Sequence, residues 1–148
     1  PFDHFTKEMT EKYFQRSLAY GALPSFFTWH GVSTFASNIY FRRPDCYERD
    51  RPLFRKYVPL CRTLSEAGWQ PVNGLLASDN PQVITEQFGD IYATVFNLSD
   101  KPQTVRLKVL PPSVATLEEL VAESTQTVSA GVLTLTLPPE TVRVFRFK

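Results

Sequence analysis

The sequence has little cysteine and histidine, no marked excess of charge and no long apolar run. Its two cysteines, Cys46 and Cys61, are too few for a disulfide scaffold, and neither has another Cys or a His at metal-ligand spacing. A net charge of +1 gives no reason to expect a nucleic-acid partner. No apolar run is long enough to span a membrane and no signal peptide is recognisable, so we expect a soluble protein without a membrane partner.

Several kinds of catalytic or binding motif are also missing from the sequence. We find no Ser/His/Asp or Cys/His arrangement and no glycine-rich phosphate loop, and we therefore expect neither a cofactor nor a metal. Asn97 begins an Asn-Leu-Ser glycosylation sequon, which has meaning only in a secreted protein. We interpret Cys61 as a small core residue and place Cys46 in a polar loop, while a single disulfide between them stays open.

What the sequence does contain is enough apolar material for a core, because 43% of its 148 residues are hydrophobic and 14% are aromatic. Residues 7–20 carry Met9, Tyr13, Phe14 and Leu18 at helical spacing, which predicts an amphipathic helix. Thr6 precedes this helix as a cap, and Gly21 and Pro24 end it. The next residues, 22–29, read ALPSFFTW, and this short run is typical of a fully buried strand.

A polar stretch without clear periodicity runs from His30 to about Asp50, and loops of this length are often functional. A second helix is predicted from Asp50 or Arg51 to Gly68, with Pro52 in its first turn and Pro59 inside it. Its apolar stripe consists of Leu53, Tyr57, Leu60, Cys61 and Leu64.

After Gly68 the pattern changes to short strands separated by turn residues. In QTVRLKVL and VLTLTL, apolar and polar side chains alternate, as half-buried antiparallel strands require. This spacing predicts a β-sandwich, and the fold class is therefore α+β. The predicted strands cover residues 70–77, 82–88, 91–98, 103–110, 117–124, 131–137 and 141–147.

The order of helix, buried strand, long loop, helix and sandwich resembles the C-terminal region of (β/α)₈-barrel glycoside hydrolases. The segment RDRPLFRKYVPLCRTLSEAGWQPV, the hairpin with FNLSDKPQTV and the ending LPPETVRVFRF carry this resemblance. It implies that residues 1–68 are the end of a barrel and that residues 69–148 are a C-terminal all-β sandwich domain. In such enzymes the two catalytic carboxylates usually lie on earlier barrel strands, for which this chain has no matching positions.

The resemblance also implies a place for substrate-binding residues, since the loop after the last barrel strand borders the sugar-binding face. An indole can stack on a sugar ring there and an imidazole can bind a hydroxyl, although a packed Trp with a satisfied His is the alternative. For the polar residues of the loop, ordinary solvation is the alternative, and the arginines at 42, 43, 49 and 51 are expected to pair with the two carboxylates. The candidate residues are Trp29, His30, Asn38, Tyr40, Asp45 and Glu48.

These observations favour a C-terminal piece of a glycoside-hydrolase-like protein whose sandwich is a structural accessory domain, with no complete catalytic site on this chain. The alternative is a free-standing sandwich module that binds a carbohydrate or a protein. Because the apolar stripes of the two helices lack a barrel to face, we expect either self-association through residues 9–64, which we favour, or packing of the helices on the sandwich.

Overall fold

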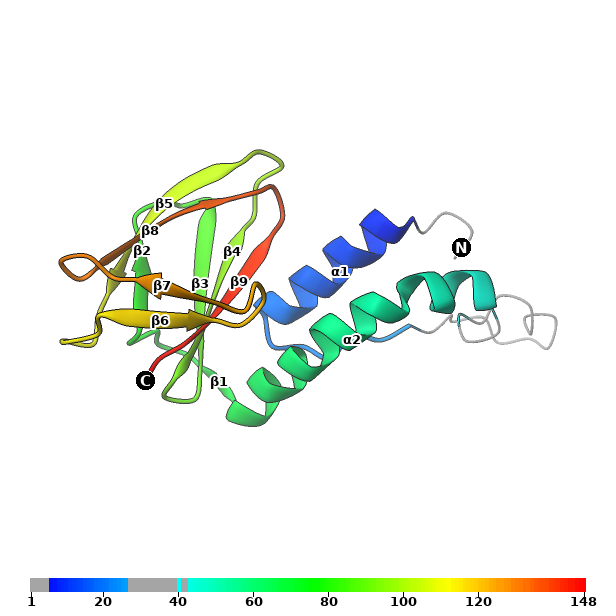
Figure 1. Ribbon diagram of the computed structural model, residues 1–148, viewed down its shortest axis with the longest axis horizontal. Coiled ribbons are helices and arrows are strands. Elements are labelled where there is room, and N and C mark those ends of the chain that lie inside the picture. The colour runs from blue at the N-terminus through cyan, green and yellow to red at the C-terminus, as the bar shows by residue number, and fades with distance from the viewer. Residues whose placement is uncertain (1–5, 27–39, 41–42) are drawn as a thin grey trace.

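The computed structural model describes residues 6–26, 40 and 43–148, and in these residues it contains two helices followed by nine strands (Figure 1). The elements form an α+β fold, as predicted: the strands build two antiparallel sheets that face each other, and the helices lie together on one side of them. The elements are α1 (Lys7–Ala19), α2 (Pro44–Ala67), β1 (Trp69–Gln70), β2 (Leu76–Ser78), β3 (Val83–Phe88), β4 (Tyr92–Asn97), β5 (Gln103–Val109), β6 (Thr116–Glu119), β7 (Ser124–Thr127), β8 (Val132–Leu137) and β9 (Val142–Arg146).

Helix α1 begins and ends where the sequence predicts. The side chain of Thr6 accepts a hydrogen bond of 3.1 Å from the backbone N–H of Met9, which satisfies one of the donors left free in a first helical turn. Gly21 follows the helix with φ +61°, and a Cβ placed on it would lie 2.3 Å from a ring carbon of Phe88. Glycine is therefore required there for both conformation and space. Residues 22–26 form no strand, and the rest of the predicted strand 22–29 lies outside the described residues.

Helix α2 starts earlier than predicted. It begins at Pro44, so residues 44–50 are helical and do not belong to a loop, and Pro52 lies inside the helix together with Pro59. The buried face of the helix extends upstream through Asp50 to Cys46. Burial of these added residues favours the longer helix. Its end at Gly68, where the backbone N–H donates to the carbonyl of Leu64, confirms the prediction.

The strands form two sheets, which we call sheet A (order β1-β3-β4-β9-β6-β7) and sheet B (order β2-β5-β8). Five predicted strands are confirmed within one or two residues, as β3, β4, β5, β8 and β9. The predicted strand 70–77 divides into β1 and β2, because Asn73 turns the chain by accepting hydrogen bonds from the backbone N–H groups of Leu75 and Leu76. The predicted strand 117–124 divides into the hairpin β6–β7.

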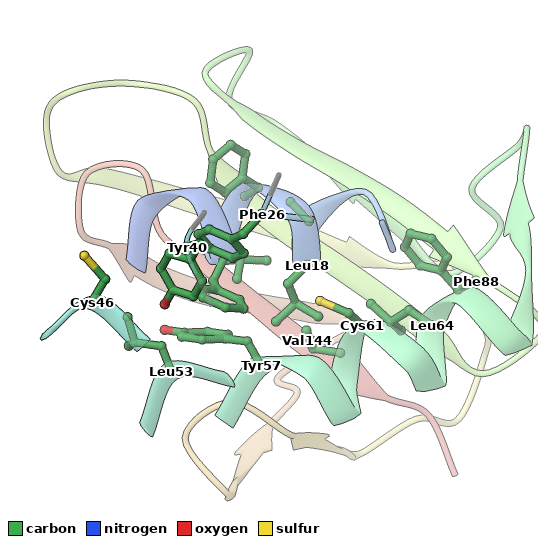
Figure 2. Packing of buried hydrophobic residues seen from close by; sticks show 14 residues of the cluster. Leu18, Phe26, Tyr40, Cys46, Leu53, Tyr57, Cys61, Leu64, Phe88 and Val144 are labelled. Carbon is green, nitrogen blue, oxygen red and sulfur yellow. The ribbon is translucent and has the colours of Figure 1, made fainter. Parts of the chain in front are cut away.

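The molecule has two clusters of buried apolar side chains, one on each face of sheet A. The first lies between the two sheets, and the second lies between sheet A and the helices. In the second cluster, α1 and α2 contribute Leu18, Tyr57 and Leu64, which pack toward Phe88 of β3 and Val144 of β9 (Figure 2). The helices and sheet A therefore share a core.

This shared core is the second of the two outcomes expected for the apolar stripes, since the helices pack on the sandwich of the same chain. The side of sheet B that faces water was predicted correctly. Four of its side chains are exposed: Arg106, Lys108, Thr134 and Thr136. Self-association through residues 9–64 stays a prediction, and Met9 and Leu23, which are 49% and 58% exposed, are apolar side chains on which it would depend.

Both cysteines are free and buried. Cys61 lies in the core, as predicted, whereas the loop position predicted for Cys46 is wrong because this residue belongs to α2. The two thiols lie on the same helix about 22 Å apart, given its rise of ~1.5 Å per residue, and a disulfide between them is excluded.

Candidate functional site

Three of the six residues predicted to bind substrate have described positions, and they lie at or near the N-terminal end of α2. Tyr40 is buried just before the helix, and Asp45 and Glu48 are exposed in its first turns. Trp29, His30 and Asn38 lie outside the described residues. The described part of the candidate site is therefore built from the start of α2 and the aromatic residues packed against it.

A buried carboxylate connects Tyr40 to the helix. Asp50 has 0% of its surface exposed, and its Oδ2 accepts a hydrogen bond of 2.9 Å from the Tyr40 hydroxyl. The guanidinium of Arg49 donates to both carboxylate oxygens of Asp50, at 2.7 and 2.8 Å. A buried charge is tolerated only when it is paired in this way. Burial and the bond to Asp50 raise the pKa of Tyr40, so its phenol is neutral and acts as a donor.

Asp45 and Glu48 are paired with arginines, as the sequence predicted. Arg43 donates two hydrogen bonds to Asp45, at 3.0 and 2.6 Å, and Arg51 donates two to Glu48, at 2.9 and 2.5 Å. In each pair the hydrogen bond from the arginine lowers the pKa of the carboxyl. Both groups are ionised at neutral pH, which is unsuited to a general acid, since that role needs a raised pKa.

Aromatic rings surround the start of α2 and leave a hollow beside it. Tyr40, Tyr47, Arg51 and Phe54 line this hollow, which has a volume of about 330 Å³. The Arg51 guanidinium lies 6.0 Å from the centre of the Tyr47 ring. Phe26 stacks on Tyr40 with their ring centres 4.6 Å apart, and Figure 2 shows both rings over the first half of α2. Apolar walls with charged groups at the rim are typical of small-molecule sites.

Asp50 is the residue that sequence reasoning missed, because it was taken for the start of the helix. A signal was present in its spacing: Asp50 precedes Leu53 by three residues and Tyr57 by seven, so it shares their buried face. A carboxylate on the buried face of a helix requires a partner, and the adjacent Arg49 supplies one.

The described residues contain no group of three or more His, Cys, Asp and Glu side chains that could hold a metal ion. Neither helix in the described ranges is long and apolar enough to cross a membrane. The described part of the site consists of aromatic surface, arginine–carboxylate pairs and one buried hydrogen-bonded network. Apolar surface and hydrogen-bonding groups thus lie side by side at the start of α2.

No family model matches this chain, and no curated protein matches its sequence. Solved structures do match. A variant of AmyP in complex with maltotriose aligns over 96% of this chain and 35% of its own, with a TM-score of 0.57 and 15% identity. Alpha-galactosidase I from Mortierella vinacea aligns over 97% of this chain and 36% of its own, with a TM-score of 0.48 and 13% identity.

An alpha-amylase from Geobacillus thermoleovorans, complexed with acarbose, aligns over 71% of this chain and 23% of its own, with a TM-score of 0.46 and 18% identity. This chain spans about a third or less of the length of each of these three proteins. The match to AmyP confirms the resemblance read from the sequence at the level of the fold: the helices and sheets of this chain are similar to a part of that maltotriose-bound protein.

Proposed function

We propose that this chain is the C-terminal part of a glycoside-hydrolase-like protein, in which residues 1–68 end a (β/α)₈-type barrel and residues 69–148 are an accessory sandwich domain. The observation that carries the proposal is the fold similarity to AmyP, which extends over 96% of this chain and so includes the helices together with the sandwich. The sandwich has a structural role in this account: it covers and stabilises the last helices of the barrel.

The packing of α1 and α2 on sheet A supports this structural role. Phe88, Phe96, Val142 and Val144 of sheet A are buried against side chains of the two helices. Burial of each large apolar side chain contributes roughly 1.5–3 kcal/mol, so this face of the sheet stabilises the helices substantially.

Polar contacts fix the helices in position on the sheet. The backbone N–H of Val142 donates to the side-chain oxygen of Gln15 at 2.8 Å, and Lys12 lies 2.7 Å from Glu140 in an ion pair. These contacts join α1 to the turn before β9 and to the first residue of that strand. They are directional, so they determine how α1 lies on the sheet, whereas the apolar contacts mainly supply the stability.

The proposal assigns substrate contact, and not bond cleavage, to the loop and the start of α2. Glycoside hydrolysis needs two carboxyl groups that flank the scissile bond, about 5–9.5 Å apart, one of them with a raised pKa. Asp45 and Glu48 both have lowered pKa values and are held by arginines. We therefore place them with Trp29, His30 and Asn38 at the rim of a sugar-binding face, where polar groups orient a ligand, and we place the buried Tyr40 in the wall of the hollow beside them.

The test has two arms on the 148-residue chain. A panel of chromogenic glycosides should show no turnover, and oligosaccharide titrations should show weak binding that the double variant Asp45→Asn, Glu48→Gln reduces. The matched control is Glu123→Gln, at an exposed carboxylate in the turn between β6 and β7. Turnover that disappears in the double variant would contradict the proposal, because the chain would then hold a catalytic site of its own.

The shared core of the helices and sheet A favours a second candidate, a free-standing module that binds a carbohydrate or a protein. A chain whose helices already bury their stripes against its own sheet can fold without a barrel. Light scattering after size-exclusion chromatography separates the two candidates. A monomer at tens of micromolar favours the module, whereas association that Met9→Ser and Leu23→Ser abolish indicates apolar surface built to be covered by another part of a larger fold.

A further inference from the structure

The edge of sheet A next to the C-terminal end of α2 presents a tryptophan to solvent. Trp69, the first residue of β1, is 57% exposed. Its indole N–H donates a hydrogen bond of 2.7 Å to Oε2 of Glu86 on β3, the neighbouring strand. Single exposed apolar residues are common on protein surfaces. The unusual feature here is that a carboxylate fixes the orientation of an exposed indole.

This arrangement has the parts of a site for a sugar ring. The indole N–H is already bound, so the ring is held in one orientation and little side-chain entropy remains to be lost on binding. The face of an aromatic ring carries partial negative charge and attracts the polarised C–H groups on one face of a pyranose. Within the described residues the second oxygen of Glu86, Oε1, accepts no hydrogen bond, which leaves it available to a sugar hydroxyl.

We propose that Trp69 and Glu86 form a surface carbohydrate-binding site on the sandwich, in which a pyranose ring stacks on the indole and one of its hydroxyls donates to Glu86. The ligand class rests on the proposed function. The location does not, because Trp69 lies two residues after Ala67, the last residue of α2, whereas Asp45 lies in its first turn. At ~1.5 Å per residue these ends are about 33 Å apart, so the two sites are separate.

The surroundings of Trp69 favour a sugar over a protein surface. Glu86 of β3 accepts the hydrogen bond of the indole, and the exposed residues Pro71 and Val72 follow β1 in the next turn. A stable protein interface needs about 800 Å² on each partner with an apolar centre, and one fixed ring with two exposed residues beside it in the chain is much smaller. One ring and one carboxylate match the size of a monosaccharide unit.

The test is a titration of the 148-residue chain with maltotriose and, separately, with cellotriose, observed through the indole N–H signal of Trp69 in an NMR spectrum. The Trp69 signal is identified as the one of the two indole signals that Trp69→Ala removes. We expect a dissociation constant on the order of 1 mM for one of the two sugars, as is reasonable for a single stacked ring. Binding by the variants is followed through the backbone amide signals of β1 and β3, because Trp69→Ala lacks the indole. Trp69→Ala should weaken binding by about tenfold or more, and Glu86→Gln by a few-fold. Tyr20→Ala, which removes another exposed aromatic ring, should change nothing.

Four results would overturn the inference. The first is the absence of any shift of the Trp69 signal with either sugar. The second is sugar binding that Trp69→Ala leaves intact and that the Asp45→Asn, Glu48→Gln variant abolishes, which would leave the proposed function standing. The third is sugar binding that neither Trp69→Ala nor the Asp45→Asn, Glu48→Gln variant weakens. The fourth is a change of oligomeric state in Trp69→Ala, which would assign the indole to a protein contact. Glycosidase turnover by the chain would refute the proposed function alone.

Discussion

The hydroxyl of Thr94, in the middle of sheet A, donates a hydrogen bond of 2.7 Å to the backbone carbonyl of Ala19, the last residue of α1. Both residues are buried, and 75 positions separate them in the chain. A helix leaves its last carbonyls without partners inside the helix, and a buried carbonyl must find one elsewhere. The strand supplies that partner, so the end of α1 depends on the sandwich.

The Thr94–Ala19 bond gives a first prediction. Thr94→Val keeps the shape of the side chain but removes the donor, and it should lower the free energy of unfolding by about 1–3 kcal/mol, because the carbonyl of Ala19 is left buried and unpaired. Thr94→Ser keeps the hydroxyl and should lose less. Urea unfolding followed by circular dichroism measures both variants. Equal stability of the Val variant and the unaltered chain would show that the bond contributes nothing.

The buried carboxylate of Asp50 gives a second prediction. Asp50→Ala removes the carboxylate that accepts from the buried Tyr40 hydroxyl and from Arg49, whose side chain is 31% exposed, and loss of these charged hydrogen bonds should cost about 1–3 kcal/mol. The matched control is Asp45→Ala, which breaks an exposed pair on the same helix and should leave the urea midpoint nearly unchanged. Similar midpoints for the two variants would contradict the role assigned to Asp50.

Asn97 gives a third prediction, and it concerns the glycosylation sequon. The side chain of Asn97 is fully buried, and its amide N–H groups donate to the carbonyls of Lys101, Leu137 and Pro138. It therefore joins the β4–β5 turn to the end of β8, and in the folded chain it cannot accept a glycan. Asn97→Ala should destabilise the chain by about 1–3 kcal/mol, measured by thermal unfolding. A glycan on Asn97 of a folded, secreted chain would contradict this assignment.

The ion pair between Lys12 and Glu140 gives a fourth prediction, on pH. The hydrogen bond from Lys12 lowers the pKa of Glu140 from its ordinary value of 4.5. Because the folded pKa is the lower one, the contribution to stability is complete above the unfolded value and is lost as the pH falls through the folded value. Arg16 also faces this carboxylate, at 3.5 Å, and Glu8 faces Lys12.

The measurement compares Glu140→Gln with the unaltered chain in urea at several pH values. The variant should be the less stable at pH 7, and the difference should shrink as the pH falls below the ordinary carboxyl pKa of 4.5 and through the lowered folded pKa. Glu123→Gln, at an exposed carboxyl away from Lys12, serves as the control. A difference that stays constant between pH 7 and pH 3 would exclude the ion pair as its source.

The sequence predicted the elements whose patterns are local. The alternation in β5 and β8 reflects one face that packs on sheet A and one face in water, and the Thr6 cap and Gly21 stop of α1 depend only on neighbouring residues. The predicted start of α2 was wrong because either Pro44 or Pro52 could occupy the first turn of a helix. The burial of Cys46 and Asp50 decided between them, and burial is a tertiary property.

The candidate site was harder to predict because its contacts join distant parts of the chain. Phe26 packs on Phe54, 28 positions later in the chain, with ring centres 5.3 Å apart, and the Tyr40–Asp50 bond depends on a helix start that was misplaced. The pairing of Asp45 and Glu48 with nearby arginines was predicted correctly, since such pairs lie within one helical turn. The division of β6 from β7 was missed because Glu119 caps the turn through the backbone N–H groups of Val121 and Ala122.

Hydrogen exchange of the intact chain, followed by mass spectrometry, tests most directly the claim that the sandwich stabilises the helices. The amides of α1 and α2 should be protected from exchange. Val144→Ala, on the face of β9 that contacts the helices, should speed the exchange of the helix amides more than that of the β5 and β8 amides. Val105→Ala, in the core between the sheets, should not single out the helices. Helices that exchange as fast as unstructured peptides, or that do not respond to Val144→Ala, would contradict the account.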